Sequence, residues 1–401
     1  MSQNNNNLMK EICKVIIENG LEGLPELLKM VFNETMKIER NQAIKAEPYE
    51  RTEERQGYAN GFKPKTVNTR VGSITVQIPQ VRGLEFYPKS LEKGCRSEKA
   101  LKLAIAEMYI QGVSTRKVRK ITEQLCGLNI TSSQVSTISK EMDKKLNEFR
   151  NRALSSFPYV ILDARYEKVR HGGCIKDLAV LVAIGINGDT GKREVLGVSV
   201  SLSEAEVHWR NFLESLQRRG LKGVRLFMSD AHSGLNNARR TIFPSIPWQR
   251  CSVHFWRNAK AYIPKKKLVR PIKLAVDDIF SATELEDAHK RVKETIIRFQ
   301  KEAPAFTNWL ENNIDESLTF HMFPQKHWRR IRTTNMLERV NQEIKRRTRV
   351  VRIFPNEESC ERLVSAFLVE LHEKWLTEKI YLNMDDLKSE KVNKIYRKKL
   401  A

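Results

Sequence analysis

The spacing of hydrophobic residues changes several times along the chain, and each change predicts a different kind of element. Residues 8–45 carry apolar side chains at intervals of three and four, which is the period of an amphipathic helix. Gly20 and Pro25 interrupt this period, so residues 1–50 are expected to form a helical N-terminal region. The region has no pattern of reactive side chains, and we expect a helical pair or a dimer contact there.

Residues 51–82 alternate between polar and apolar positions, which is the period of a β-strand. With a turn at Gly72-Ser73, this alternation predicts a β-hairpin inside a basic segment of residues 51–96. The hairpin carries four basic residues: Lys63, Lys65, Arg70 and Arg82. They would either follow a phosphate backbone or form a solvated face, and the sequence favours neither interpretation.

Residues 97–150 return to a helical period with start and stop signals. Ser114 can cap one helix, and Gly127 can end it. Thr131 can cap the next helix, and Gln134 completes a capping box with it. Helix, short turn with a glycine, and helix in a basic chain are typical of a helix-turn-helix DNA-binding domain, although ordinary helical hairpins have the same pattern. The third helix would offer these side chains to a major groove: Ser132, Ser133, Ser136, Thr137 and Lys140.

From residue 157 the pattern becomes α/β. Three strands joined by tight turns are followed by a helix, a strand, a helix and a strand-like segment, an order that predicts a ribonuclease-H-like fold. The five strand-like runs cover residues 159–169, 174–186, 193–202, 224–230 and 246–255. The catalytic domain would comprise residues 157–254, an all-helical insertion at 255–331, closing helices at 332–380 and a basic tail at 381–401.

Composition points to a polyanionic partner. The 401 residues are enough for two or three domains, and 71 Lys and Arg against 48 Asp and Glu give a net charge of +23. This charge exceeds what solubility needs, and double-stranded DNA is the leading candidate for its partner. No apolar run long enough to span a membrane and no signal peptide is found, so no membrane partner is expected. Scattered cysteines without a C-x-x-C pair favour an intracellular location.

Three acidic residues stand where metal-dependent chemistry on DNA would need them. Asp163 lies inside the first predicted strand, Asp230 ends a later one, and Glu338 lies near the start of a basic helix within residues 333–356. A second interpretation of Glu338 is a capping box in which Asn335 is the N-cap residue. Together the three acids fit a site for two Mg²⁺ ions, because this hard cation prefers carboxylates; Mn²⁺ is a plausible substitute.

Other candidate residues carry weaker signals. Cys251 and His254 form a C-x-x-H motif without a second pair at a suitable spacing, so packing or a DNA contact is favoured over zinc. His232 would contact a scissile phosphate or lie on the surface as an ordinary histidine. Basic residues of the helix would neutralise phosphates: Arg339, Lys345, Arg346 and Arg347. Three tryptophans would stack on a distorted base or, as favoured, pack in a core: Trp209, Trp248 and Trp256.

These residues also stand in motifs that resemble one family. The chain is similar to bacterial insertion-sequence transposases of the Mutator type in the segments LDARY, LFMSDAHSGL, WQRCSVHFWRNA, TTNMLERVNQEIKRRTRVVRIFPN and YERTEERQGYANGFKPKTVNTRVGSITVQIPQVR. The resemblance covers most of the chain. It implies that Asp163, Asp230 and Glu338 are a catalytic DDE triad that holds two Mg²⁺ ions. It also matches Cys251 and His254 to the family's C-x-x-H motif.

The resemblance implies an enzyme that binds the terminal inverted repeats of its mobile element, cuts the DNA and joins the freed 3'-hydroxyl end to target DNA. It further implies at least a homodimer on DNA and a bacterial cytoplasmic protein associated with the nucleoid. Two alternatives stay open: a catalytically silent DNA-binding regulator, and a nuclease without strand transfer.

Overall fold

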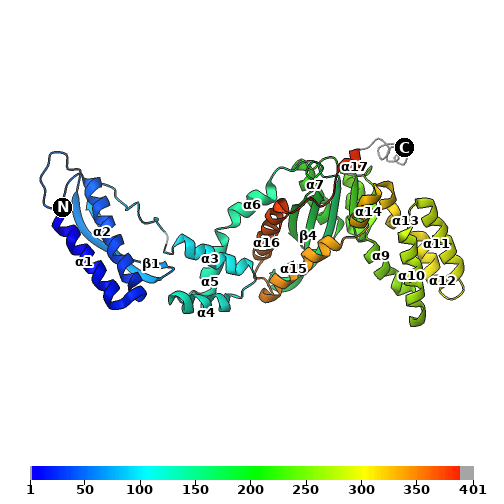
Figure 1. The fold of residues 1–401 in the computed structure, drawn as a ribbon, viewed down its shortest axis with the longest axis horizontal. Helices are drawn as coiled ribbons and strands as arrows, with labels where there is room; N and C mark the ends of the chain where they lie inside the picture. Colours follow the sequence, from blue (N-terminus) through cyan, green and yellow to red (C-terminus); the bar gives the residue numbers. More distant parts are fainter. Residues whose placement is uncertain (1, 95, 389–401) are drawn as a thin grey trace. The chain divides into compact units, whose positions relative to one another are not determined.

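Residues 2–94 and 96–388 are described by the structure, a computed structural model. They form a mixed α/β chain with a helical N-terminus and a sheet-containing core (Figure 1). The chain divides into two units, residues 1–141 and 142–401. Most of the predicted basic tail lies outside the described residues. Within the described ranges, every helix is too short or too polar to span a bilayer.

The first unit begins with the predicted helices. They are α1 (Ser2–Asn19), the short 3₁₀ helix η1 (Gly20–Gly23) and α2 (Leu24–Ile44). Gly20 ends α1 because its φ of +55° lies in the left-handed region that favours glycine. Pro25 is accommodated in the first turn of α2, where a backbone N–H has no partner in the helix.

The predicted hairpin follows. It consists of the antiparallel strands β1 (Tyr58–Thr69) and β2 (Gly72–Arg82). The turn predicted at Gly72-Ser73 was wrong, because Thr69 pairs with Gly72 and the turn residues are Arg70 and Val71. The Thr69 hydroxyl donates to the Gly72 carbonyl (2.7 Å), which closes the turn two residues earlier.

Three helices complete the first unit: α3 (Lys99–Ile110), α4 (Thr115–Cys126) and α5 (Ser132–Lys140). The predicted caps are present. Ser114 accepts a hydrogen bond from the backbone of α4, and Gly127 ends that helix with a φ of +65°. Thr131 and Gln134 form the capping box, with backbone to side-chain distances of 2.8 and 3.2 Å. The five polar candidates on α5 are exposed, and their contact with DNA stays a prediction.

The second unit is built on a five-stranded sheet, and α6 (Asp143–Asn151) precedes it. Its strands are β3 (Tyr159–His171), β4 (Cys174–Ile186), β5 (Arg193–Ser201), β6 (Leu226–Ser229) and β7 (Trp248–Arg250). The strand order is β5-β4-β3-β6-β7. β3, β4 and β5 form an antiparallel meander, whereas β6 and β7 run parallel to β3. This order of elements agrees with the order predicted from the sequence.

Helices cover both faces of the sheet (Figure 1). They are α7 (Glu206–Arg218), α8 (Ser233–Ile242), α15 (Asn335–Val351) and α16 (Glu357–Thr377). Successive side chains of β3 point to opposite faces. Val160 and Leu162 enter the hydrophobic core that α7 and α8 complete. Asp163 points to the other face and hydrogen-bonds to α15.

A helical segment separates β7 from α15, as predicted. Its helices are α9 (Ser252–Ala259), η2 (Lys260–Tyr262), α10 (Lys266–Ser281), α11 (Leu285–Phe299), α12 (Pro304–Asn313), α13 (Asp315–Leu318), η3 (Thr319–Met322) and α14 (Gln325–Ile331); α17 (Asp385–Lys388) lies beyond α16. The strand predicted through residue 255 was wrong, because β7 ends at Arg250. The Cys251 N–H still donates to the carbonyl of Ser229, the last residue of β6 (2.8 Å), and Cys251 is the N-cap residue of α9.

Candidate catalytic site

Asp163 lies on β3, and Asp230 directly follows the neighbouring strand β6. β3 and β6 are parallel and pair Ile161 with Met228, so each aspartate lies two residues beyond that pair. Neighbouring strands are about 4.8 Å apart, which brings the two carboxylates within electrostatic range. The sheet thus brings together two of the three acids predicted from the sequence.

Burial and a neighbouring charge set the protonation of Asp163. Burial raises the pKa of Asp163 to about 7, and the charge of Asp230 adds to this effect. Asn341 Nδ2 donates to Asp163 Oδ2 (2.8 Å), and the Ala164 N–H donates to Oδ1 (2.9 Å). We did not predict Asn341 from the sequence. Its place three residues after Glu338, on the same side of the helix, is the signal that could have revealed it.

Further polar contacts fix α15 against β3. Arg165 donates to the Asn341 carbonyl and pairs with Glu167 (2.6 Å). Thr348, two turns further along α15, donates to Glu167 Oε1 (2.9 Å). Because side chains alternate along a strand, Arg165 and Glu167 point to the same face of β3 as Asp163. The position of Asn341 relative to Asp163 is therefore held by several bonds.

Glu338 lies in the first turn of α15 and does not belong to a capping box. Thr334 is the N-cap residue, and the Glu338 N–H bonds to its carbonyl (3.0 Å), so the helix begins one residue earlier than the capping-box interpretation requires. That interpretation was wrong. The Glu338 Oε1 atom instead lies 2.9 Å from Arg257 Nη1 and 3.6 Å from His254 Nε2. Neither approach has hydrogen-bond geometry, so Oε1 has no hydrogen-bond partner among the described residues.

The C-x-x-H motif lies beside these acids. The neighbouring Cys251 raises the pKa of His254, and the charges of Asp163 and Asp230 add to this effect against that of burial. Burial disfavours the Cys251 thiolate, but the neighbouring His254 and the hydrogen bond from Thr334 outweigh burial and lower the pKa of the thiol. The Thr334 N–H donates to Cys251 Sγ (3.3 Å). Cys251 thereby joins the end of β7 to the start of α15, which supports the packing interpretation.

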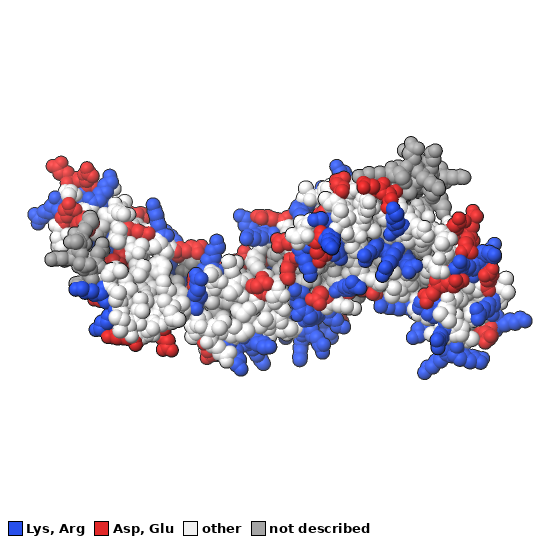
Figure 2. All heavy atoms as spheres, viewed as in Figure 1, with Lys and Arg blue, Asp and Glu red and all other residues white. Residues whose placement is uncertain are grey.

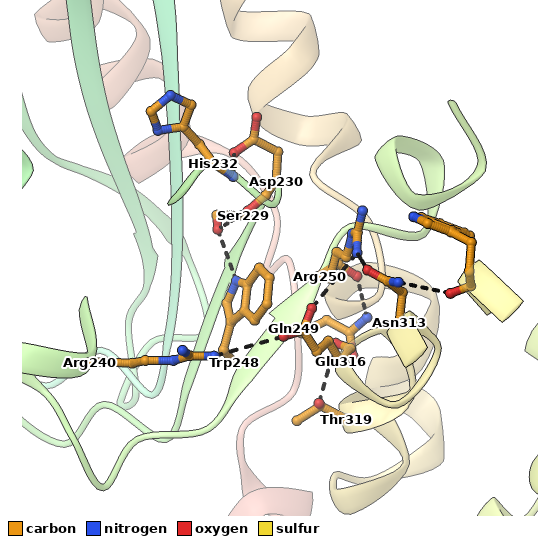
Figure 3. A network of polar contacts seen from close by, with 11 residues as sticks. Ser229, Asp230, His232, Arg240, Trp248, Gln249, Arg250, Asn313, Glu316 and Thr319 are labelled. Atoms are coloured by element: carbon orange, nitrogen blue, oxygen red, sulfur yellow. Dashed lines mark hydrogen bonds and ion pairs between the residues drawn. The ribbon is translucent and has the colours of Figure 1, made fainter. Parts of the chain in front are cut away.

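A fourth carboxylate, Glu204, lies near Asp230 in the loop before α7. Burial raises the pKa of Glu204, while His232 opposes and Asp230 reinforces the shift. Glu204 Oε2 lies 3.6 Å from His232 Nδ1, and the Glu204 side chain is 12% exposed. The His232 N–H donates to Asp230 Oδ1 (3.3 Å), and Figure 3 shows both residues after β6. Asp163 also senses the charge of Glu204. The loop sequence has no motif that marks Glu204.

These carboxylates suit a hard divalent cation. Asp163 and Asp230 repel each other, and Glu338 has an oxygen without a hydrogen bond, so a bound cation would relieve both conditions. In the described part of the chain, no three His, Cys, Asp or Glu side chains are placed to hold one ion together. The two aspartates lie near each other, while Glu338 faces Arg257.

The basic residues of α15 differ in accessibility. Three of the predicted DNA contacts are exposed: Arg339, Lys345 and Arg346. Arg347 is 5% exposed, lies 3.2 Å from both Glu343 and Glu370, and stacks over Phe367. Because its charge is neutralised within the protein, we remove Arg347 from the predicted DNA contacts. On the face that Figure 2 shows, Lys and Arg side chains lie over both units.

Two of the candidate tryptophans belong to the core. Trp209 and Trp248 are 0% and 6% exposed and pack in the cluster between the sheet and α7. Trp248 Nε1 donates to Ser229 Oγ (2.9 Å), directly before Asp230 (Figure 3). The favoured core interpretation is confirmed for these two residues, and Trp256 is partly buried.

Known proteins resemble this chain over nearly its whole length. The transposase for insertion sequence element IS406 from Burkholderia multivorans is 50% identical over 94% of this chain and 98% of its own length. The transposase for insertion sequence element IS256 in transposon Tn4001 from Staphylococcus aureus is 38% identical over 96% of this chain and 100% of its own length.

Among solved structures, the Drosophila P element transposase strand transfer complex aligns with 75% of this chain and 90% of that chain. Its identity of 10% and TM-score of 0.30 are too low to establish a common fold. The sequence match is decisive, because a model described as "Transposase, Mutator family" covers residues 2–378. The chain that carries this cluster of acids belongs to the Mutator family of transposases.

Proposed function

We propose that this protein cuts DNA at the terminal inverted repeats of an insertion sequence and joins the 3'-hydroxyl end to target DNA by DDE chemistry. The observation that carries the proposal is the pair Asp163, on β3, and Asp230, directly after the adjacent parallel strand β6, whose charge acts on Asp163. Glu338 would complete the triad from the start of α15. The order of elements around the three acids is typical of a ribonuclease-H-like domain with a helical insertion between β7 and α15.

Asp163, Asp230 and Glu338 would hold two Mg²⁺ ions, with Mn²⁺ as a substitute. Such ions, when bound, activate the attacking oxygen and stabilise the leaving oxygen of a phosphodiester. The chain itself orients the carboxylates: Asn341 holds Asp163 by a hydrogen bond of 2.8 Å. Glu204 adds a further negative charge that Asp163 senses, which favours cation binding.

Glu338 has cationic partners that a metal ion would replace. The Arg257 side chain is 58% exposed, so it can leave Glu338 without a burial penalty. Once released, its guanidinium would be available to a DNA phosphate, to which a planar guanidinium can donate two parallel hydrogen bonds. His254, whose pKa is raised by its polar surroundings, would continue to balance the remaining carboxylate charge.

DNA would contact both units. Exposed basic residues that follow Glu338 would neutralise phosphates, and helix α5 would present its exposed polar residues to a major groove. Joining two ends of one element needs both ends in one complex, so we propose at least a homodimer on DNA. Such a protein would work on chromosomal DNA in the bacterial cytoplasm.

The test uses purified protein, a labelled duplex that carries the element's end, target DNA and Mg²⁺. Glu338→Gln should abolish joined product and keep DNA binding, whereas the matched control Glu343→Gln, on the same helix and outside the acid cluster, should form product. Product that is cut but never joined would support the nuclease alternative. Binding without product, alike in wild type and Glu338→Gln, would support the regulator and overturn the proposal.

A further inference from the structure

A polar pocket opens directly beside the acid cluster. It has a volume of about 580 Å³ and lies between α8, η2 and α12, so the helical insertion forms one of its walls. Ala231, the residue after Asp230, lines it. The lining includes none of the catalytic acids and none of the predicted DNA contacts, so the proposed function leaves this pocket without a role.

The pocket lining is rich in amides and almost balanced in charge. Asn236, Asn237 and Asn258 line it, and Asn236 Oδ1 is buried without a hydrogen-bond partner in the described residues. Glu316 lies 3.9 Å from Arg240 and 3.8 Å from Arg250, so it offsets part of their charge (Figure 3). A phosphate site would need unpaired cations, whereas amides offer donors and acceptors to a neutral, hydrogen-bonding ligand.

Aromatic rings form a second part of the lining. Tyr262 and Trp309 stack with centroids 5.3 Å apart and planes at 21°. Trp309 is held from behind by Phe255 (4.7 Å) and by Arg250, whose Cζ lies 5.3 Å from the ring centroid. Arg250 is itself 4% exposed and donates to Asn313 Oδ1 (3.0 Å), as Figure 3 shows. The stack is therefore rigidly supported.

One ring of this stack is open to a ligand. Tyr262 is 43% exposed although one of its faces is covered by Trp309. An aromatic face beside amide groups is the combination that binds a nucleobase, because the base stacks on the ring and hydrogen-bonds along its edge.

We propose that this pocket binds the base of one unstacked nucleotide next to the phosphate at Asp230. This inference rests on the proposed function, because it takes DNA as the substrate. Tyr262 stacks on the base, and Asn236 accepts a hydrogen bond from its edge. The base leaves the duplex, which frees the backbone at the neighbouring phosphate to approach the carboxylates. The helical insertion thus positions the DNA end relative to the catalytic carboxylates.

The experiment pairs protein variants with abasic DNA. Affinity for the element's end is measured by fluorescence anisotropy in chelator, while a single abasic residue is stepped through the terminal nucleotides. Tyr262→Ala should weaken binding to the intact end by about 5- to 100-fold, the range expected for one stacked base. At one abasic position, wild type and Tyr262→Ala should bind alike. Tyr262→Phe, which keeps the ring, should bind as wild type throughout, and Asn236→Ala should couple to the same position.

A second measurement needs no variant. A thymine placed opposite the coupled position should gain permanganate reactivity when wild-type protein binds, because its partner has left the stack. Equal effects of Tyr262→Ala at every abasic position, together with an unreactive thymine, would overturn the pocket assignment. If the protein still joins DNA in Mg²⁺, only this inference fails. If it neither binds nor cuts the end, the proposed function fails as well.

Discussion

Removal of the Asn341 amide tests whether α15 orients the catalytic carboxylate. Asn341 Nδ2 donates to Asp163 Oδ2 over 2.8 Å, and the backbone of Asn341 is fixed by Arg165. Asn341→Ala removes this bond and leaves the rest of the helix in place. The Asp163 carboxylate then keeps only the Ala164 N–H as a hydrogen-bond donor in the described residues and is free to rotate.

The size of the effect follows from the kind of bond that is lost. A hydrogen bond to a charged group contributes about 1.5–3 kcal/mol. If this free energy is lost from the transition state, the rate of joining falls by about 10- to 100-fold. Substitution of residues that orient metal ligands reduces activity by a similar factor. Affinity for DNA should stay within about twofold, because Asn341 faces Asp163 and contributes no charge.

The assay compares joined product formed per minute with affinity for the element's end, both as a function of Mg²⁺ concentration. Gln342→Ala is the matched control, because Gln342 is the exposed neighbour on the same helix. The reasoning is refuted if Asn341→Ala and Gln342→Ala join DNA at the same rate, or if Asn341→Ala loses DNA binding in proportion to product.

Three further predictions concern charge. Arg339→Ala should reduce the slope of log DNA affinity against log salt concentration by about one and leave thermal stability unchanged. Arg347→Ala should cost about 1–3 kcal/mol of stability and leave this slope unchanged. The reverse pattern would contradict the assignment of Arg339 to DNA and of Arg347 to the protein interior. Burial lowers the pKa of His372 to about 4, so the unfolded chain binds the proton more tightly, and stability should fall by roughly 3 kcal/mol as pH drops from about 6.5 to 4. His372→Gln should remove this part of the acid sensitivity in urea titrations at both pH values; an equal loss in wild type and variant speaks against it. Glu204→Gln should weaken Mn²⁺ binding measured by calorimetry by about 10-fold, and unchanged affinity would exclude Glu204 from the site.

Local signals in the sequence were enough to predict many elements. The Thr131 and Gln134 capping box forms as predicted, because such boxes depend on residues three positions apart. The order of strands and helices in the second unit also follows from period alone. The predicted end of β7 was wrong, because Val253 and Phe255 continue the apolar pattern of the strand in the sequence. The last residue of β7, Arg250, pairs with the last residue of β6, and the sequence of β7 does not contain this limit.

The contacts of the site could not be predicted in the same way. Asn335 and Glu338 have capping-box spacing, yet the helix begins after Thr334, whose N–H bonds to the distant Cys251. Glu204 joins Asp163 and Asp230 only through tertiary packing of its loop. The sequence predicts Arg347 to be one of several exposed basic residues, but in the structure Glu370 and Phe367 of α16 cover its side chain. Each of these outcomes depends on a partner far away in the chain.

The central claim is that Asp163 and Asp230 hold the cation needed for strand transfer. The most direct measurement is Mn²⁺ binding to the wild-type protein on its DNA end, by calorimetry, compared with Asp163→Asn and with the control Asp177→Asn at the exposed start of β4. Asp163→Asn should lose Mn²⁺ affinity by about 10-fold or more, while Asp177→Asn should bind as wild type. Equal Mn²⁺ affinity in all three proteins would contradict this claim.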